Sequence, residues 1–156
     1  MIDETKVPRY AKHTDTLICG FFGPYRYLSN FYPASVWFEG EIYPSSEHAY
    51  QAAKFPITDR RTHNWQIMSP SETKVLGRTA PNNKEFEIRK KEVMLQIVLS
   101  KFLSNPQLKA ALVSTGDKFL EESNAWSDVY WGVCDGKGEN HLGKILMMVR
   151  DIAKKV

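Results

Sequence analysis

Apolar residues return at helical spacing along most of the chain after residue 45. Asn83 precedes one such series, which predicts a long helix with one apolar face: Phe86, Val93, Ile97, Val98 and Phe102. Asn140 precedes a second, uninterrupted series: Leu142, Ile145, Leu146, Val149 and Ile152. Because asparagine is a residue type that starts helices, both segments are predicted to be helices.

Three shorter segments carry helix start and stop signals. The segment 45–55 begins with a capping serine and must end before Pro56. The segment 69–77 begins with a Ser-Pro-Ser-Glu capping box and ends at a glycine. The segment 105–116 begins with Asn-Pro and ends at a glycine, and its inward positions are predicted to be Leu108, Ala111 and Leu112.

Strands and turns are predicted before residue 45. Nine of the 19 aromatic residues lie between Phe21 and Tyr43, among glycines and prolines that interrupt helices. Residues 16–22 are predicted to form a strand, and residues 36–43 a hairpin that turns at Glu39-Gly40. The pattern therefore predicts a mainly α fold with a small N-terminal antiparallel β element (α+β in a loose sense), as a single domain over residues 1–156.

The composition is that of an ordinary globular protein, with 42% hydrophobic residues and a net charge of +3. Charges of both signs are mixed along the chain, whereas a dedicated nucleic-acid binder shows a basic stripe. No apolar run approaches the roughly 18 residues that a membrane span needs, and the chain begins without an apolar signal segment. We therefore expect a cytoplasmic protein that does not associate with membranes.

The metal-binding residue types are scattered. Cys19 and Cys134 are far apart in the sequence, which favours two reduced thiols over a redox pair. The four histidines include no pair at metal-ligand spacing. The sequence therefore predicts no metal site.

The segment SEHAYQAAKF carries the most informative polar residues. At 100° per residue, its alanines share one face of the helix, and Glu47, Tyr50, Gln51 and Lys54 share the opposite one. A buried helix must direct such polar groups into a cleft or pair them. Glu47 is then a candidate base or cation stabiliser, and Lys54 a candidate phosphate ligand or nucleophile. The alternative is a solvated polar face on a surface helix.

A second candidate region is residues 124–143. It combines Asp128 with two tryptophans, Trp126 and Trp131, and a glycine-bearing loop that leads into the last helix. Free N–H groups at a helix start bind anions, so a phosphate is expected near Gly138 and Asn140. Asn140 could instead cap its own helix, which is the ordinary role of asparagine at that position.

A third candidate region is residues 24–33. Arg26 could bind a phosphate there, and Asn30 and Phe31 lie between aromatic turns. A plain surface loop is the alternative.

Together these segments resemble the NADAR (YbiA-like) family from about Ile18 to Arg150. The motifs that carry the resemblance are LSNFYP, SSEHAYQAAKF, SPSETKVLGR, KFLSNPQL, STGDKFLEES, SDVYWG and GKGENHLGKILMMVR, in that order. The resemblance implies a compact helical fold and an N-glycosidase that cleaves the bond from a ribose anomeric carbon to an exocyclic amine. It implies neither a metal nor a cofactor.

The resemblance also assigns roles to residues. Glu47 matches the catalytic carboxylate, Lys54 the family lysine and Asp128 the acid of the D-x-x-W-G motif. The residues that match the family's pocket are Asn30, Phe31, Trp131, Gly138 and Asn140. The further residues expected around the substrate are Arg26, Tyr50, Phe86 and Trp126. Phe86 stands where some relatives carry tryptophan, so a smaller stacking platform is expected to change substrate preference.

Two substrate classes follow from the resemblance. One is ADP-ribosylated guanine in nucleic acid or nucleotides, with a functional link to a DNA ADP-ribosyltransferase toxin. The other is a phosphorylated ribosylamino-pyrimidine intermediate of riboflavin synthesis. The competing hypothesis is a module that binds ADP-ribose or a similar nucleotide without cleaving it.

Overall fold

The computed structural model describes residues 6–156. The chain divides into two compact units: a central unit, Asn30–Asn105, and a terminal unit, formed by the residues up to Ser29 and by Pro106–Val156. The prediction of a single domain over residues 1–156 stays a prediction. No helix within residues 6–156 is long and apolar enough to cross a membrane.

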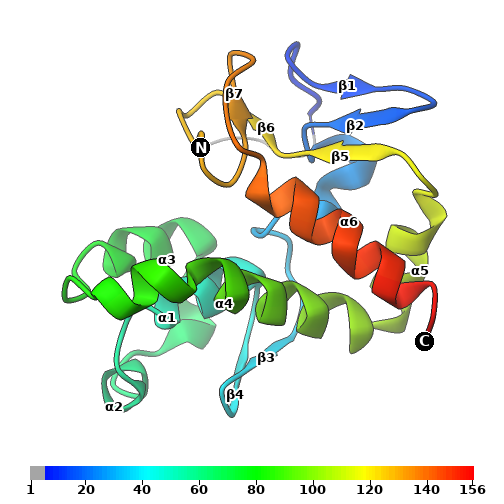
Figure 1. The fold of residues 1–156 in the computed structure, drawn as a ribbon. Coiled ribbons are helices and arrows are strands. Elements are labelled where there is room, and N and C mark those ends of the chain that lie inside the picture. The colour runs from blue at the N-terminus through cyan, green and yellow to red at the C-terminus, as the bar shows by residue number, and fades with distance from the viewer. Residues whose placement is uncertain (1–5) are drawn as a thin grey trace. The chain divides into compact units, whose positions relative to one another are not determined.

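The central unit is a hairpin followed by helices (Figure 1). Its elements are β3 (Val36–Phe38), β4 (Glu41–Tyr43), α1 (Ser46–Ala52), α2 (Ile57–Arg60), the 3-10 helix η2 (Trp65–Ile67), α3 (Pro70–Gly77) and α4 (Lys84–Leu103). The predicted hairpin is confirmed: Glu39 and Gly40 both have positive φ, 46° and 85°, as a two-residue turn between antiparallel strands requires. The helix α1 packs against α3 and α4.

The predicted helix starts are present in the central unit. The Ser45 hydroxyl accepts the His48 N–H at 3.2 Å, and the Ser69 hydroxyl accepts the Glu72 N–H at 3.1 Å. The side-chain oxygen Oδ1 of Asn83 accepts the Phe86 N–H at 3.2 Å. Each bond satisfies one N–H that the first helical turn leaves without an intrahelical partner. All five predicted apolar positions of α4 are buried, so that the long helix lies with one face in the core.

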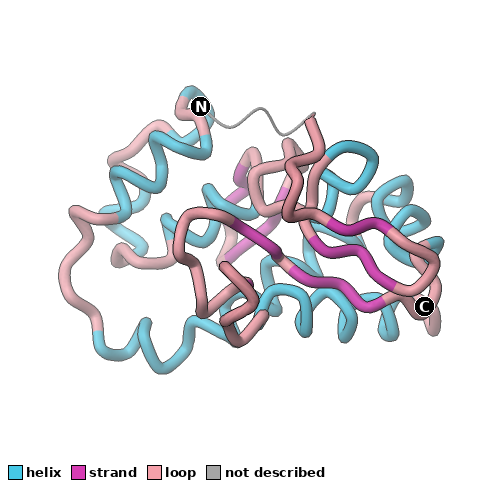
Figure 2. The backbone as a smooth tube through the Cα atoms, turned by 90° about the horizontal axis from the view of Figure 1, so that it is seen from above, coloured by secondary structure: helices cyan, strands magenta, loops and turns pink. Residues whose placement is uncertain are grey.

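The terminal unit holds a small sheet and the last helix. Its elements are β1 (Lys12–His13), β2 (Leu17–Cys19), the 3-10 helix η1 (Gly23–Leu28), α5 (Pro106–Ser114), β5 (Phe119–Glu121), β6 (Ser123–Asn124), β7 (Val133–Cys134) and α6 (His141–Ala153). β2 is the middle strand of the order β1-β2-β5, antiparallel to β1 and parallel to β5 (Figure 1). The three strands lie side by side (Figure 2). The apolar stripe of α6 packs against β5.

The mainly helical α+β class is thus confirmed, with one addition. β5 and the pair β6–β7 come from the second half of the chain, and both β2–β5 and β6–β7 pair in parallel. Parallel pairing joins segments that lie far apart in sequence, so no local turn signal announces it.

Candidate active site

The polar face of α1 is buried. Glu47 is 6% exposed, Tyr50 8% and Gln51 3%, so the alternative of a solvated surface face is wrong. The Gln51 side-chain N–H donates to the Glu47 carboxylate at 2.8 Å, one turn away. A carboxylate is therefore held in place in the interior of the central unit, where charge is costly unless it has a function or partners.

The first turn of α1 is positioned by two neighbouring segments. The Glu47 N–H donates to the Asn30 carbonyl at 3.0 Å, which ties the LSNFYP segment to the helix start. His48 is bonded on both ring nitrogens, Nε2 to the Met68 carbonyl at 2.7 Å and Nδ1 to the Ser45 hydroxyl at 2.6 Å. Burial lowers the pKa of His48, so its ring is neutral; Nε2 then donates to Met68, and Nδ1 accepts from Ser45.

Lys54 follows α1 and shares the surroundings of Glu47. Its Nζ lies 5.3 Å from the centroid of the Tyr50 ring. Burial lowers the pKa of Lys54; the carboxylates of Glu47 and Glu87 act in the opposite direction, and Lys74 and Lys90 lower the pKa further. A lysine with a lowered pKa has a larger fraction of neutral amine, the form that can act as a nucleophile.

Phe86 lies in the first turn of α4, as its place in the apolar series predicts. Its ring centroid is 5.5 Å from that of Tyr50, with the planes tilted by 58°, and the side chain is buried. The central unit thus brings Asn30, Glu47, Tyr50, Lys54 and Phe86 into one connected group.

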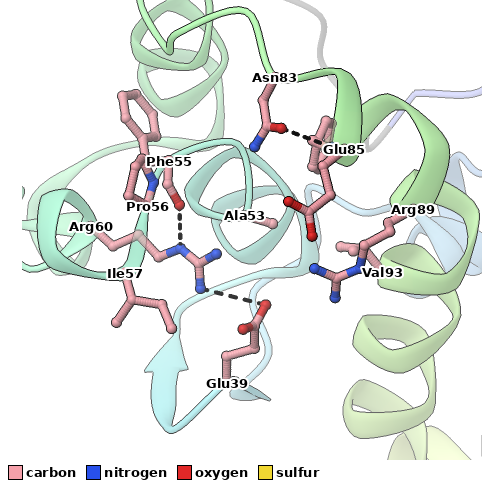
Figure 3. A pocket seen from close by; sticks show the side chains of 11 residues that line it. Glu39, Ala53, Phe55, Pro56, Ile57, Arg60, Asn83, Glu85, Arg89 and Val93 are labelled. Carbon is pink, nitrogen blue, oxygen red and sulfur yellow. Dashed lines mark hydrogen bonds and ion pairs between the residues drawn. The ribbon is translucent and has the colours of Figure 1, made fainter.

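A cavity of about 200 Å³ lies beside this group (Figure 3). Ala53, directly after α1, lines this cavity, whereas Glu47, Tyr50 and Lys54 do not. The lining residues are Glu39, Ala53, Phe55, Pro56, Ile57, Arg60, Asn83, Glu85, Phe86, Arg89 and Val93. The Arg60 guanidinium donates to the Phe55 carbonyl at 2.9 Å and pairs with Glu39 at 3.6 Å. This cavity is therefore separate from the polar face of α1.

In the terminal unit, Asp128 organises a turn. Its Oδ1 accepts the N–H groups of Tyr130 at 3.2 Å and Trp131 at 2.9 Å. Trp131 packs edge-on against Tyr130, with ring centroids 4.8 Å apart. Trp126 is 39% exposed on the same loop. Arg26 also belongs to this unit, half-buried in η1.

Asn140 does not cap α6 with its side chain. Its side-chain nitrogen donates to the Leu120 carbonyl at 3.0 Å, and its side-chain oxygen accepts the Glu122 N–H at 3.0 Å. The residue has φ +53°, makes no side-chain cap on α6 and is buried. Its amide group therefore holds β5 against the start of α6, and its predicted contact with the substrate stays a prediction.

The N–H groups at the start of α6 are also occupied. Asn140, His141 and Leu142 donate to the carbonyls of Gly132, Tyr130 and Trp131, at 3.3, 3.2 and 2.9 Å. The premise that these three N–H groups are free is therefore wrong, because the backbone of residues 130–132 accepts them; a phosphate near Gly138 and Asn140 stays a prediction. Gly138 allows the loop before α6 to pack closely against the backbone of Gly132 and Val133. A side-chain carbon at Gly138 would overlap the Gly132 carbonyl.

Replacing Gly138 with alanine is expected to lower stability by about 3 kcal/mol or more, because φ is +150° and the new methyl group meets backbone. Gly136→Ala is the matched control, since Gly136 also has positive φ but nothing within 4 Å, and we expect a loss of about 1–2 kcal/mol. Thermal unfolding of both variants measures the difference. The predicted binding role of Gly138 stays a prediction: a changed KM at unchanged stability would favour it over packing.

Sequence reasoning missed Lys74. Its Nζ lies 5.8 Å from the Phe31 ring centroid, which connects the SPSETKVLGR and LSNFYP segments. A lysine five residues after the capping Ser69 is an ordinary surface residue in a sequence, so only its spatial neighbours single it out. Within residues 6–156, no group of three or more His, Cys, Asp or Glu side chains has the arrangement of a metal site.

Known proteins resemble the chain over most of its length. An N-glycosidase of Nostoc punctiforme is 35% identical over 135 residues, which cover 82% of this chain and 85% of that protein. The N-glycosidase YbiA of Escherichia coli is 35% identical over 127 residues, 80% and 79% of the two chains. Its NMR structure superimposes with a TM-score of 0.79 and 31% identity, covering 97% of this chain and 93% of the other.

A riboflavin biosynthesis protein of Vibrio vulnificus is 40% identical over 129 residues, 80% of this chain. The match spans only 35% of that protein, so the chain corresponds to about a third of its length. The NADAR domain model matches residues 13–153. The relatives from Nostoc punctiforme and Escherichia coli, which are named N-glycosidases, are matched over most of their own length. Together with the domain match, this similarity shows that the chain belongs to the NADAR family.

Proposed function

We propose that this protein is an N-glycosidase that hydrolyses the bond between a ribose anomeric carbon and the exocyclic amine of a base. The observation that carries the proposal is the buried face of α1, where Glu47 is held by Gln51 and lies close enough to Lys54 for their charges to interact. Asp128 is proposed as the second acid. No metal or cofactor is needed for this chemistry.

The carboxylate of Glu47 suits the charge that develops in the reaction. As the C–N bond lengthens, positive charge forms on the sugar, and a buried carboxylate stabilises it more strongly than an exposed one. Water then adds its oxygen to the anomeric carbon, and its proton leaves with the released amine. Glu47 can accept the proton from water in this route, as carboxylates do in other glycosidases.

Lys54 offers a second route. Its neutral amine attacks the anomeric carbon of the ring-opened sugar, and the base leaves as a free amine; the resulting imine is hydrolysed by water to release the sugar and regenerate the lysine. The lowered pKa of Lys54 supports this route, since burial favours the attacking neutral form. We propose Lys54 as the nucleophile and Glu47 as its proton-transfer partner.

For the substrate we propose a phosphorylated ribosylamino-pyrimidine. Relatives from Vibrio vulnificus and maize are named riboflavin biosynthesis proteins, although the match covers only 35% and 25% of their lengths. The exposed Trp126 and half-buried Trp131 are proposed to contact the base. ADP-ribosylated guanine is the second candidate, since it presents the same bond and a phosphoryl group on the same ribose carbon.

A binding module without catalysis is the alternative. Such a module has little reason to hold a buried carboxylate beside a half-buried lysine of lowered pKa, because each costs folding free energy. A functional link to a DNA ADP-ribosyltransferase toxin would follow only from the guanine substrate.

The proposal is tested by incubating the protein with the ribosylamino-pyrimidine phosphate and, separately, with ADP-ribosylated guanine DNA, both with and without a chelator. We expect free pyrimidine amine and ribose 5-phosphate from the first, unchanged by the chelator. Release from the DNA alone would assign the second substrate. Tight binding of either compound without release of base or sugar would contradict hydrolysis and favour the binding module.

A further inference from the structure

We infer that Lys74, with the Phe31 ring beneath it, forms the subsite for the phosphoryl group on C5 of the substrate ribose. That the bound sugar is a ribose rests on the proposed function. That an anion binds at Lys74 rests on the geometry of the central unit. The two substrate candidates share this phosphoryl group, as a monophosphate in one and as part of a pyrophosphate in the other.

The first line of evidence is the packing of α3 on α1 (Figure 1). Gly77 lies so close to α1 that a side-chain carbon there would overlap the Gln51 amide. Lys74 is one turn before Gly77, on the same face of α3. Because Gln51 donates to the Glu47 carboxylate at 2.8 Å, the Lys74 face of α3 adjoins the Glu47 face of α1.

The second line reaches the same place from another segment. Lys74 Nζ lies 5.8 Å from the Phe31 ring centroid, within range of a cation–π contact. Phe31 follows Asn30, whose carbonyl accepts the Glu47 N–H at 3.0 Å. Two independent paths thus connect Lys74 to residues that contact Glu47, one through α3 and Gln51 and the other through the LSNFYP segment.

The third line is charge. The charges of Lys54, Lys74 and Lys90 interact, and the carboxylates acting on Lys54 are Glu47 and Glu87. Lys90 donates to Glu87 at 2.9 Å, so its charge is balanced. Lys74 makes no ion pair with any residue in the described range 6–156. An unbalanced ammonium group next to a second lysine repels it, and a bound phosphoryl group removes that repulsion.

The alternative anion site at the start of α6 lacks these features. The N–H groups of Asn140, His141 and Leu142 are bonded to backbone carbonyls. Lys74 remains half-buried, so that a phosphoryl group would meet an ammonium already partly removed from water. In this inference, Lys74 of the central unit binds the phosphoryl group that was expected to lie near Gly138 and Asn140.

Lys74→Met is the test, with Lys74→Arg as the charge-preserving rescue. We expect Lys74→Met to raise KM for the 5-phosphorylated ribosylamino-pyrimidine about 10- to 100-fold with little change in kcat, because a charge-assisted bond to phosphate is lost. The dephosphorylated riboside should be cleaved equally well by both proteins. Lys91→Met, at an exposed position of α4, controls for net charge and should leave both substrates unaffected.

A binding measurement separates this inference from the proposed function. Calorimetric titration with ribose 5-phosphate, ADP-ribose and ribose needs no turnover, and Lys74→Met should weaken the first two and not ribose. If the wild type cleaves no candidate substrate but loses ribose 5-phosphate affinity with Lys74→Met, the subsite stands and the proposed function fails. Equal losses on phosphorylated and dephosphorylated ligands, or an unchanged affinity for ribose 5-phosphate, would overturn the subsite alone.

Discussion

Glu47→Gln is expected to lower kcat by about 10²- to 10⁴-fold, the usual contribution of a carboxylate that transfers a proton or stabilises charge in the transition state. The glutamine keeps the size of the side chain, and its carbonyl oxygen can still accept the Gln51 N–H. The fold of the central unit should therefore survive, with a melting temperature close to that of the wild type or above it, since a buried charge is removed. KM should change little, because the lost interaction forms mainly in the transition state.

Glu92→Gln is the matched control, since Glu92 is an exposed carboxylate on α4 and its change should leave kcat and KM as they are. The measurement is steady-state hydrolysis of the substrate identified above, with thermal unfolding on the same preparations. Undiminished turnover in Glu47→Gln would remove the carboxylate from the mechanism. A loss of turnover that tracks a loss of folded protein would assign Glu47 a structural role instead.

The sequence predicts the active helix well because the relevant information is local. The spacing of alanines and large polar residues within residues 45–55 gives the face of α1 that carries Glu47, whereas the burial of that face depends on packing against α3 and α4. Helix caps at Ser45, Ser69 and Asn83 are equally local, since each bond spans three residues.

The failures are long-range. Asn140 has the residue type and position of a helix cap, but β5 and the backbone of residues 130–132 reach its side chain and its N–H first. Nothing within the last helix announces those partners. Lys74 and Phe31 illustrate the converse, because 43 positions separate them in the sequence and only tertiary packing makes them neighbours. The candidate residues within each motif can thus be predicted from the sequence, whereas the distances between residues of different motifs cannot.

Lys54→Met is the second change with a large expected effect. If Lys54 is the nucleophile, kcat should fall by roughly 10³-fold or more, as when a covalent catalytic residue is removed. Stability should stay the same or rise. Burial lowers the pKa of Lys54 below its unfolded-state value, so protonation is disfavoured in the folded protein, and at neutral pH the charged lysine destabilises the fold; methionine removes that cost. A drop in melting temperature alongside the loss of activity would contradict this reading.

The pH dependence of kcat distinguishes the two roles of Lys54 by its sign. A nucleophilic lysine must be neutral, so kcat rises with pH until it passes the lowered pKa of Lys54 and then levels off. A lysine that acts through its positive charge gives the opposite result, a kcat that falls as pH rises through the same range. Borohydride added during turnover provides an independent measurement, because it reduces an imine on Lys54 to a stable secondary amine. The mass of this adduct is that of the protein plus the sugar, less one water and plus two hydrogens. We expect the rising profile together with the adduct, and neither in Lys54→Met; a falling profile without adduct would return the chemistry to Glu47 and water.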